Sequence, residues 1–290
     1  MSPTAIPGNL ILQSPSNSIW KITSDQVNPP GDAAITYDIT NAGGVFNLRS
    51  TGAVDYEIEW GDGAVEISTL NTLPHTYTAG DYSVVVYSDG VYRPYFNNVT
   101  ADVSQITSVT IGPGANLGTN LTNAWYGANN MTSFVCPFDV TSGVTNFFSA
   151  WFGLSILTSF PLINTSSGTN FGAAWYSCSS LTSFPLLNTS SSTSFFLAWY
   201  NCSSLADFPA NMFDTTGTLV ANAFAFAWQI CALTAQSIEN ILVSLDTNGA
   251  SNITLSIDGG TNAAKTTWSA AAVTAYDNLI VKGWTISFNA

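Results

Sequence analysis

Few residues of this 290-residue chain could carry out chemistry, and they stand far apart. A general base needs a nucleophile or an acid nearby, and the single histidine, His75, is instead expected to be a structural residue ahead of a strand pair. The only carboxylates of the middle of the chain are Asp139, Asp207 and Asp214. A glycosidase needs two carboxylates facing each other across a cleft, and these are expected to lie apart. We therefore predict no catalytic residue and no enzyme, and a glycan-active enzyme is the unfavoured alternative.

The cysteines are expected to be buried free thiols. Three of the four stand three residues after a tryptophan: Cys178, Cys202 and Cys231. The same position in the two preceding segments holds Ala128 and Leu154. A position that accepts alanine, leucine and cysteine is typical of an apolar core. Disulfides and metal ligation are the less favoured alternatives.

A calcium site is a second alternative to a purely structural interpretation. Asp62 could join Asp55, Glu57 and Glu59, because hard cations bind carboxylate oxygens. Residues at a spacing of two share only a strand face, however, and Gly-Asp-Gly makes a tight turn by itself. The sequence also lacks a phosphate-binding loop and the common metal-binding spacings. We predict no metal site and no cofactor.

The charge balance excludes two classes of partner. The chain has 5 Lys+Arg against 18 Asp+Glu, a net charge of -13, and charged residues make up 8%. Nucleic-acid binding through phosphates and a basic membrane-surface helix are therefore not expected. No apolar run reaches the roughly 18 residues of a membrane span, so no membrane insertion is predicted. The start, Met-Ser-Pro-Thr-Ala-Ile-Pro-Gly, does not resemble a secretory signal.

An internal repeat organises the middle of the chain. Tryptophans recur at intervals of 24 to 29 residues, at positions 125, 151, 175, 199 and 228. Ala precedes every one of them, Phe or Leu stands four residues before, and Phe usually stands nine residues after. A period in the twenties predicts a solenoid whose coils stack identical residues in ladders. Phe-x-x-Ala-Trp-x-x-Cys has near-helical spacing and is expected to form the return segment of each coil.

The other half of each coil is expected to be a short strand. Leu181-x-x-Phe184-x-Leu186 places apolar residues at 1, 4 and 6, the leucine-rich spacing. Asn164-Thr-Ser-Ser and Asn188-Thr-Ser-Ser should then turn the chain, because Asn and Ser bond their own backbone. The pattern resembles the BspA-type leucine-rich repeats, with Trp in place of the family Phe. That resemblance covers about residues 103–233, occurs in bacterial adhesins and phage structural proteins, and implies binding or scaffolding without catalysis.

Residues 33–101 differ in character and hold short alternating runs separated by turn residues. Trp60-Gly-Asp-Gly63 is followed by His75-Thr-Tyr77, Gly80, Tyr82 and Val84. This pair of motifs resembles the PKD domain, an immunoglobulin-like sandwich that acts as a spacer or adhesion module. The fold class expected is mainly β: this β-sandwich, then a leucine-rich-repeat solenoid over 102–233, then an α/β cap over 234–290. Residues 1–32 are predicted to be an N-terminal arm, either docked on a partner or disordered.

Two stripes of the repeat are candidate binding surfaces. One follows each Trp: Tyr126, Phe152, Tyr176 and Tyr200. The other comprises strand positions expected to face outward: Pro161, Pro185, Pro209, Ile163 and Leu187. Tyrosine offers rigid area with a polar tip, which suits contacts with sugar or protein. The alternative is that the rings pack between coils.

The modules suggest a function class better than they suggest a partner. The favoured hypothesis is a virion protein, a phage head or tail appendage that contacts other virion proteins or a host-surface protein or glycan. A bacterial cell-surface adhesin is the alternative, and it would need an export signal. A solenoid that binds ice or glycan by itself is suggested only by rows of Thr and Ser. A homo-oligomer is possible, although no coiled-coil heptad is visible.

Overall fold

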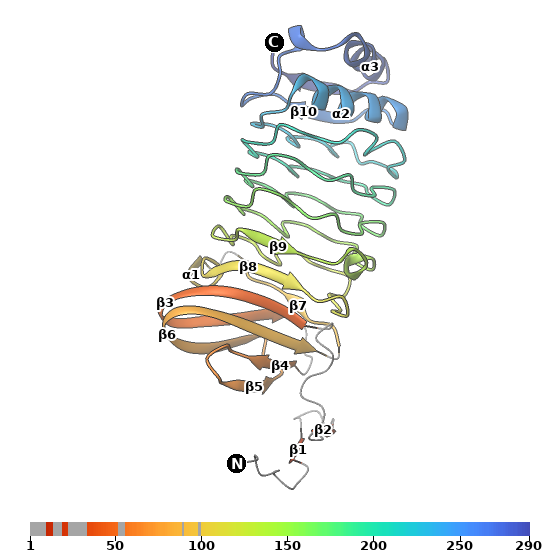
Figure 1. Cartoon of the computed structure of the whole chain (residues 1–290). Coiled ribbons are helices and arrows are strands. Elements are labelled where there is room, and N and C mark those ends of the chain that lie inside the picture. The colour runs from red at the N-terminus through yellow and green to blue at the C-terminus, as the bar shows by residue number, and fades with distance from the viewer. Residues whose placement is uncertain (1–9, 14–18, 23–33, 52–55, 89, 98–99) are drawn as a thin grey trace, which may run out of the picture.

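The computed structural model describes residues 10–13, 19–22, 34–51, 56–88, 90–97 and 100–290. These residues are mostly β, and the described part of the chain is elongated (Figure 1). Most of the predicted N-terminal arm lies outside the described residues. Within it, β1 (Leu10–Gln13) and β2 (Ile19–Ile22) pair antiparallel.

One mixed sheet of seven strands opens the fold. Its strands are β3 (Ala34–Thr51), β4 (Tyr56–Glu59), β5 (Val65–Ser68), β6 (Thr72–Ser88), β7 (Arg93–Pro94), β8 (Ile106–Ile111) and β9 (Ser133–Val135). They follow the order β5-β4-β6-β3-β8-β9, with β7 also beside β3. All pairs are antiparallel except β8 with β9. The first of the short alternating runs expected in residues 33–101 are thus joined in one long strand, β3.

A long two-stranded ribbon of β3 and β6 shapes this sheet. In the first half of β3, Ile35 and Tyr37 are buried, whereas in the second half Phe46 and Leu48 are buried. Successive side chains of a strand point to opposite faces, so the ribbon buries one face before Gly43-Gly44 and the other face after them. Both glycines have positive φ, which side chains rarely tolerate. The division into two packed sheets, expected from the PKD resemblance, remains a prediction.

A buried carboxylate fastens the sheet to the rest of the chain. Asp102 lies in the short helix α1 (Thr100–Val103) and is 2% exposed. One of its oxygens accepts from the side chain of Asn47 at 2.7 Å, and the other from Arg49 Nε at 2.8 Å. From here β8 and β9 continue the sheet into a stack of coils, so that one hydrophobic core runs through both parts (Figure 1).

The coils stack through their return segments, which we define as residues 121–128, 147–154, 171–178, 195–202 and 224–231. The N–H of each Trp from 125 to 199 donates to the alanine carbonyl beside the next Trp, always at 2.9 Å. Residues two before and two after each Trp have positive φ, for example Ala173 and Ser177 around Trp175. The return segments are therefore not helical, although their apolar residues have near-helical spacing. It arises from consecutive tight turns, in which Ala174 N–H donates to Phe171 C=O and Cys178 N–H to Trp175 C=O.

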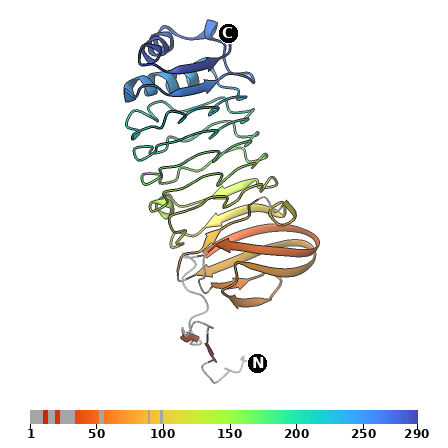
Figure 2. The same cartoon turned by 180° about the vertical axis from the view of Figure 1, so that it is seen from behind.

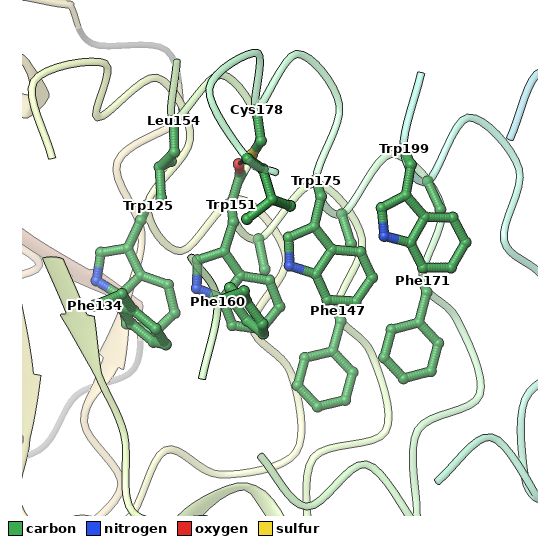
Figure 3. Packing of buried hydrophobic residues seen from close by; sticks show 14 of the residues in the cluster. Trp125, Phe134, Phe147, Trp151, Leu154, Phe160, Phe171, Trp175, Cys178 and Trp199 are labelled. Atoms are coloured by element: carbon green, nitrogen blue, oxygen red, sulfur yellow. Dashed lines mark hydrogen bonds between the residues drawn. The ribbon is translucent and has the colours of Figure 1, made fainter. Parts of the chain in front are cut away.

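Aromatic rings fill the inside of the stack (Figure 3). Neighbouring Trp rings stack with centroids 5.8, 5.5, 5.4 and 4.9 Å apart along the chain. A second column of rings stands nearly perpendicular to them, as with Trp175 and Phe184 at 4.7 Å and 77°. All five Trp side chains are fully buried, as are the alanines that precede them. The ladders predicted from the Trp period are thus present as ring stacks.

Two coils depart from the expected leucine-rich spacing, whereas the first coil keeps it, with Met131, Phe134 and Cys136 buried. Leu157, Phe160 and Ile163 are buried, at a spacing of three, whereas Leu162 is 53% exposed. The next coil buries Leu187 and exposes Leu186 in the same way. A prolyl residue follows Phe160 and Phe184 directly and lacks the N–H that a β ladder needs. Buried side chains therefore recur there every three residues and not at the two-residue period of a strand.

Hydroxyl and amide side chains tie the turns of the stack together. Asn164 and Asn188 accept from the backbone N–H two residues on, at 3.1 and 3.0 Å, which confirms the predicted turns. Thr145, Thr169 and Thr193 each donate to the carbonyl of the Thr one coil earlier, at 3.0 or 3.1 Å. Neighbouring coils are thereby joined by side-chain hydrogen bonds as well as by backbone hydrogen bonds.

Two helices and two strands cap the stack, close to the positions expected (Figure 2). They are α2 (Ala235–Asn248), β10 (Thr254–Ile257), α3 (Ala270–Val281) and β11 (Thr285–Phe288). β10 pairs parallel with β11 and bridges to Phe224, so the cap extends the row of return segments. Polar side chains of α2 bond the last coil: Ser237 accepts from Phe208 N–H at 2.9 Å, and Ser244 from Phe213 N–H at 2.8 Å.

The alanine before each Trp gives the first testable prediction. Ala174 is fully buried, and Ala174→Thr should destabilise the fold by about 1–3 kcal/mol because it overpacks the stack. Urea unfolding followed by Trp fluorescence measures the change. Ala206→Thr is the matched control: Ala206 is partly exposed in the position where earlier coils carry Thr158 and Thr182, so its effect should stay within about 0.5 kcal/mol. Equal losses at the two positions would contradict the packing argument.

Candidate binding surfaces

The histidine belongs to a packed structural cluster. Its ring stacks on Trp60 with centroids 4.5 Å apart and planes 9° apart, and Nε2 lies 2.8 Å from Asp62 Oδ2. Asp62 also accepts from Ala64 N–H at 3.0 Å, which closes the tight turn. A Cβ at Gly61 would lie 2.7 Å from the Ser83 carbonyl oxygen, so the motif needs glycine there. Tyr77 packs edge-on against the imidazole with centroids 4.6 Å apart, and its hydroxyl donates to the Trp60 carbonyl at 2.8 Å. The geometry around His75 is that of a packed structural cluster.

The described residues contain no group of three or more His, Cys, Asp or Glu side chains placed to hold a metal ion. Of the carboxylates considered for calcium, Asp55 lies outside the described residues. A shallow surface depression of about 420 Å³ is lined by Asp38 and Asp81 among others. Both oxygens of Asp38 accept serine hydroxyls, from Ser83 and Ser108, each at 2.5 Å.

All four cysteines are buried and free, as predicted. Cys178 Sγ lies 3.2 Å from the carbonyl oxygen of Trp151, and Cys202 and Cys231 lie 3.1 Å from the carbonyl of the Trp one coil earlier. Burial raises the pKa of the Cys178 thiol to about 12. A thiolate is the reactive form of cysteine, so these side chains are inert core groups.

The Tyr row lies on the outer side of the return segments as one continuous stack. Tyr126, Phe152, Tyr176 and Tyr200 are half-buried, and successive ring centroids are 4.3, 4.4 and 4.9 Å apart with planes within 16° of parallel. Burial, with smaller contributions from Tyr200 and Tyr126, raises the pKa of the Tyr176 hydroxyl. Because each inner ring covers its neighbours' faces, the row offers ring edges and neutral hydroxyls to a partner. The rings therefore pack between coils and reach the surface as well.

The second predicted stripe needs a correction. Pro161, Pro185 and Pro209 are partly exposed, but Ile163 and Leu187 are 1% and 3% exposed and belong to the core. The outward apolar residues are instead Leu162 and Leu186. The cause is the three-residue spacing of buried side chains after Phe160 and Phe184, which places these two positions inside.

Beside Leu162 and Leu186 runs a surface of hydroxyl groups that the stripe omitted. It comprises Thr132, Ser133, Thr158, Ser159, Thr182 and Ser183, all of which are exposed. We call these residues together with Leu162 and Leu186 the hydroxyl face. The recurrent Thr and Ser residues of the sequence could have indicated this face.

A further set of exposed aromatic residues escaped the sequence analysis. Phe148, Phe196 and Phe226 are 40%, 36% and 44% exposed on the outer side of the return segments. The signal was a second Phe directly after the core Phe that stands four residues before a Trp, as in Phe147-Phe148 and Phe195-Phe196. We call these three residues together with the Tyr row the aromatic face.

Comparison of the chain with protein-family models, with curated proteins and with solved structures gives no match. Among the described helices, none is long and apolar enough to cross a membrane.

Thiol burial gives the second prediction. At pH 8, a thiol reagent such as Ellman's reagent should label the folded chain only at the rate of unfolding, because burial disfavours every thiolate. In denaturant it should label all four cysteines. Rapid labelling of the folded chain at the rate of free cysteine would contradict the burial.

The Asp62–His75 pair gives the third prediction. The hydrogen bond from His75, and next the one from Ala64 N–H, lower the pKa of Asp62 from its ordinary value of 3.8. A carboxyl whose pKa is lower in the folded than in the unfolded state stabilises the fold at any pH above its unfolded-state pKa. This stabilisation is lost as the pH falls through the pKa of the folded state. Asp62→Asn should therefore lower the free energy of unfolding at pH 5, by less than about 1 kcal/mol for so exposed a pair. The difference from the unaltered chain should shrink toward pH 2.5, as measured by urea titration, and a constant difference would exclude this linkage.

Proposed function

We propose that this chain is a non-enzymatic structural and adhesion protein of a virus particle, a head or tail appendage that displays a rigid binding surface. The observation that carries the proposal is the continuous stack of coils. Its polar groups bond from coil to coil, its thiols are buried, and its surface is uncharged over most of its length. Such a stack is suited to holding a surface in a fixed shape, and it brings no catalytic pair together.

The proposal includes the two family resemblances. Coils of 24 to 29 residues with a recurrent Trp support the BspA-type repeat over residues 102–233. In the coils that begin at Leu157 and Leu181 the inward spacing is 1, 4 and 7, which departs from the family's 1, 4 and 6. In residues 33–101, the ribbon that buries opposite faces in its two halves supports a two-layered, PKD-like module. The remaining divisions are the arm, residues 1–32, and the cap, residues 234–290.

The hydroxyl face is the surface that we assign to the external partner. Exposed hydroxyls recur there at the coil spacing, about 4.8 Å for neighbouring strands, and Leu162 and Leu186 add apolar area beside them. Hydroxyl groups both donate and accept, so this face can match the hydroxyls of a host-surface glycan or the backbone of a host protein. Residues 103–232 carry no Lys or Arg, so an anionic partner is not favoured.

The fourth prediction tests where the protein acts. Mass spectrometry of virus particles purified from a lysate of the producing cells should recover the chain at a fixed ratio to capsid or tail proteins. The cell-envelope fraction of the same cells is the control. Recovery in the envelope alone would exclude the virion assignment and favour the bacterial adhesin.

A further inference from the structure

Neighbouring coils are joined by bonds that run along the length of the stack. At the junction of the third and fourth coils, four backbone N–H groups of the return segment donate to the next coil at 2.8 or 2.9 Å. They belong to Phe171, Ala173, Trp175 and Ser177. The hydroxyl bond of Thr193 and the ring stack of Trp175 on Trp199, at 5.4 Å, cross the same junction. A force that pulls the coils apart therefore acts along these bonds.

The junctions between coils are nearly identical. Each return segment within residues 121–202 donates four backbone hydrogen bonds to the next coil, at 2.7–3.1 Å. All four cysteines are free, so no disulfide links one coil to another. In a stack whose repeats contact only their neighbours, stability is a sum of repeat terms and junction terms. Because the junctions are alike, we expect them to break at similar forces.

The two ends of the stack lie far apart, with the sheet at one end and the cap at the other (Figure 1). When these ends are pulled apart, the junctions carry the load in series, so each junction bears the whole force and breaks by itself. A coil is held on one side only once its outer neighbour has gone. Unravelling therefore proceeds coil by coil from an end of the stack.

The cap is attached to the last coil through buried side chains as well as through backbone. On α2, the buried Ser237 and Ser244 accept backbone N–H groups of that coil at 2.9 and 2.8 Å. Asn262 is 4% exposed and donates to the Trp228 carbonyl at 2.8 Å. Breaking a buried hydrogen bond leaves its partners unpaired, which is costly. Unravelling from this end therefore begins only after the cap has been released.

We propose that the repeat stack is a force-extensible element, which unravels one coil at a time from the cap end when its two ends are pulled apart. A coil of 24 residues releases about 80 Å of extended chain and loses one coil spacing of about 5 Å. The freed residues refold on the coil that remains, because their partners lie only one coil away in the sequence. The stack then lengthens under load, which limits the force on any partner bound to its faces. This inference does not depend on the virion assignment.

The fifth prediction is stepwise extension of a single molecule in optical tweezers. Thiol-linked handles at Gly114→Cys and Ala290→Cys, two exposed positions, leave β3 to β8 outside the loaded segment. The native cysteines are buried and should not react with the handles. A first release should be followed by steps of about 75–80 Å at similar forces, and relaxation should reverse them. A single rupture of about 550–600 Å, which frees the roughly 176 residues between the handles at once, would overturn the proposal.

Matched variants of α2 test where unravelling begins. Ser237→Ala with Ser244→Ala removes two acceptors that hold the last coil, so it should lower the force of the first release and leave the length of the later steps unchanged. Thr247→Ala is the control, because the Thr247 hydroxyl is exposed and bonds within α2, to the Val243 carbonyl. This control should leave every force unchanged. Circular dichroism confirms that each variant is folded. An equal first force in both variants would refute unravelling from the cap end.

Discussion

The stacking of one coil on the next is the constraint on which the rest of the structure depends. The ring of each Trp from 125 to 199 stacks on the Trp ring of the next coil, while the backbone N–H of the same Trp donates to the alanine carbonyl of that coil, so the distance between coils must satisfy both contacts. The buried alanine, the perpendicular Phe and the thiol bonded to a Trp carbonyl follow from that spacing. Stacking has a cost in folding free energy, because five indole N–H groups of the coils are buried without a hydrogen-bond acceptor among the described residues. An unpaired buried donor costs about 1–3 kcal/mol, which the ring contacts must offset.

The parts of the fold that could be predicted are those in which one residue type repeats. The Trp period, the Asn turns, the buried cysteines and the cap elements all follow from spacing alone. The course of the backbone around each Trp did not, because positive φ at Ala173, Leu197 or Phe226 has no signature in those side chains. Stacking imposes that conformation, which costs about 1–2 kcal/mol per residue, and a local pattern cannot show it. The outward placement given to Ile163 failed for a similar reason: the period changes after a proline, in a segment that looked like a strand.

Of the candidate surfaces, too, one part could be predicted from the repeat and another part could not. The Tyr row was visible because it repeats at a fixed distance from Trp, whereas its edge-on presentation depends on the distance between coils. Phe148 and Phe196 were hidden beside identical core residues, and only the fold separates the buried ring from the exposed one. Two faces of opposite chemistry result. One carries hydroxyl groups and the other aromatic rings, and both are free of cationic side chains.

The direction of the hydrogen bonds along the return segments has an electrostatic consequence. Residues four and two before each Trp from 125 to 199, the Trp itself and the residue two after it all donate toward the C-terminal neighbour. Their peptide dipoles therefore add, as they do in a helix, with the positive end at the cap. Trp228 and Ile230 donate there to the β10 region, at Ser256 and Asp258, and the Asp258 carboxylate is held by Gln229 and Ser287. The row of return segments thus has aligned peptide dipoles, and the Asp258 carboxylate lies beside the end toward which their N–H groups point.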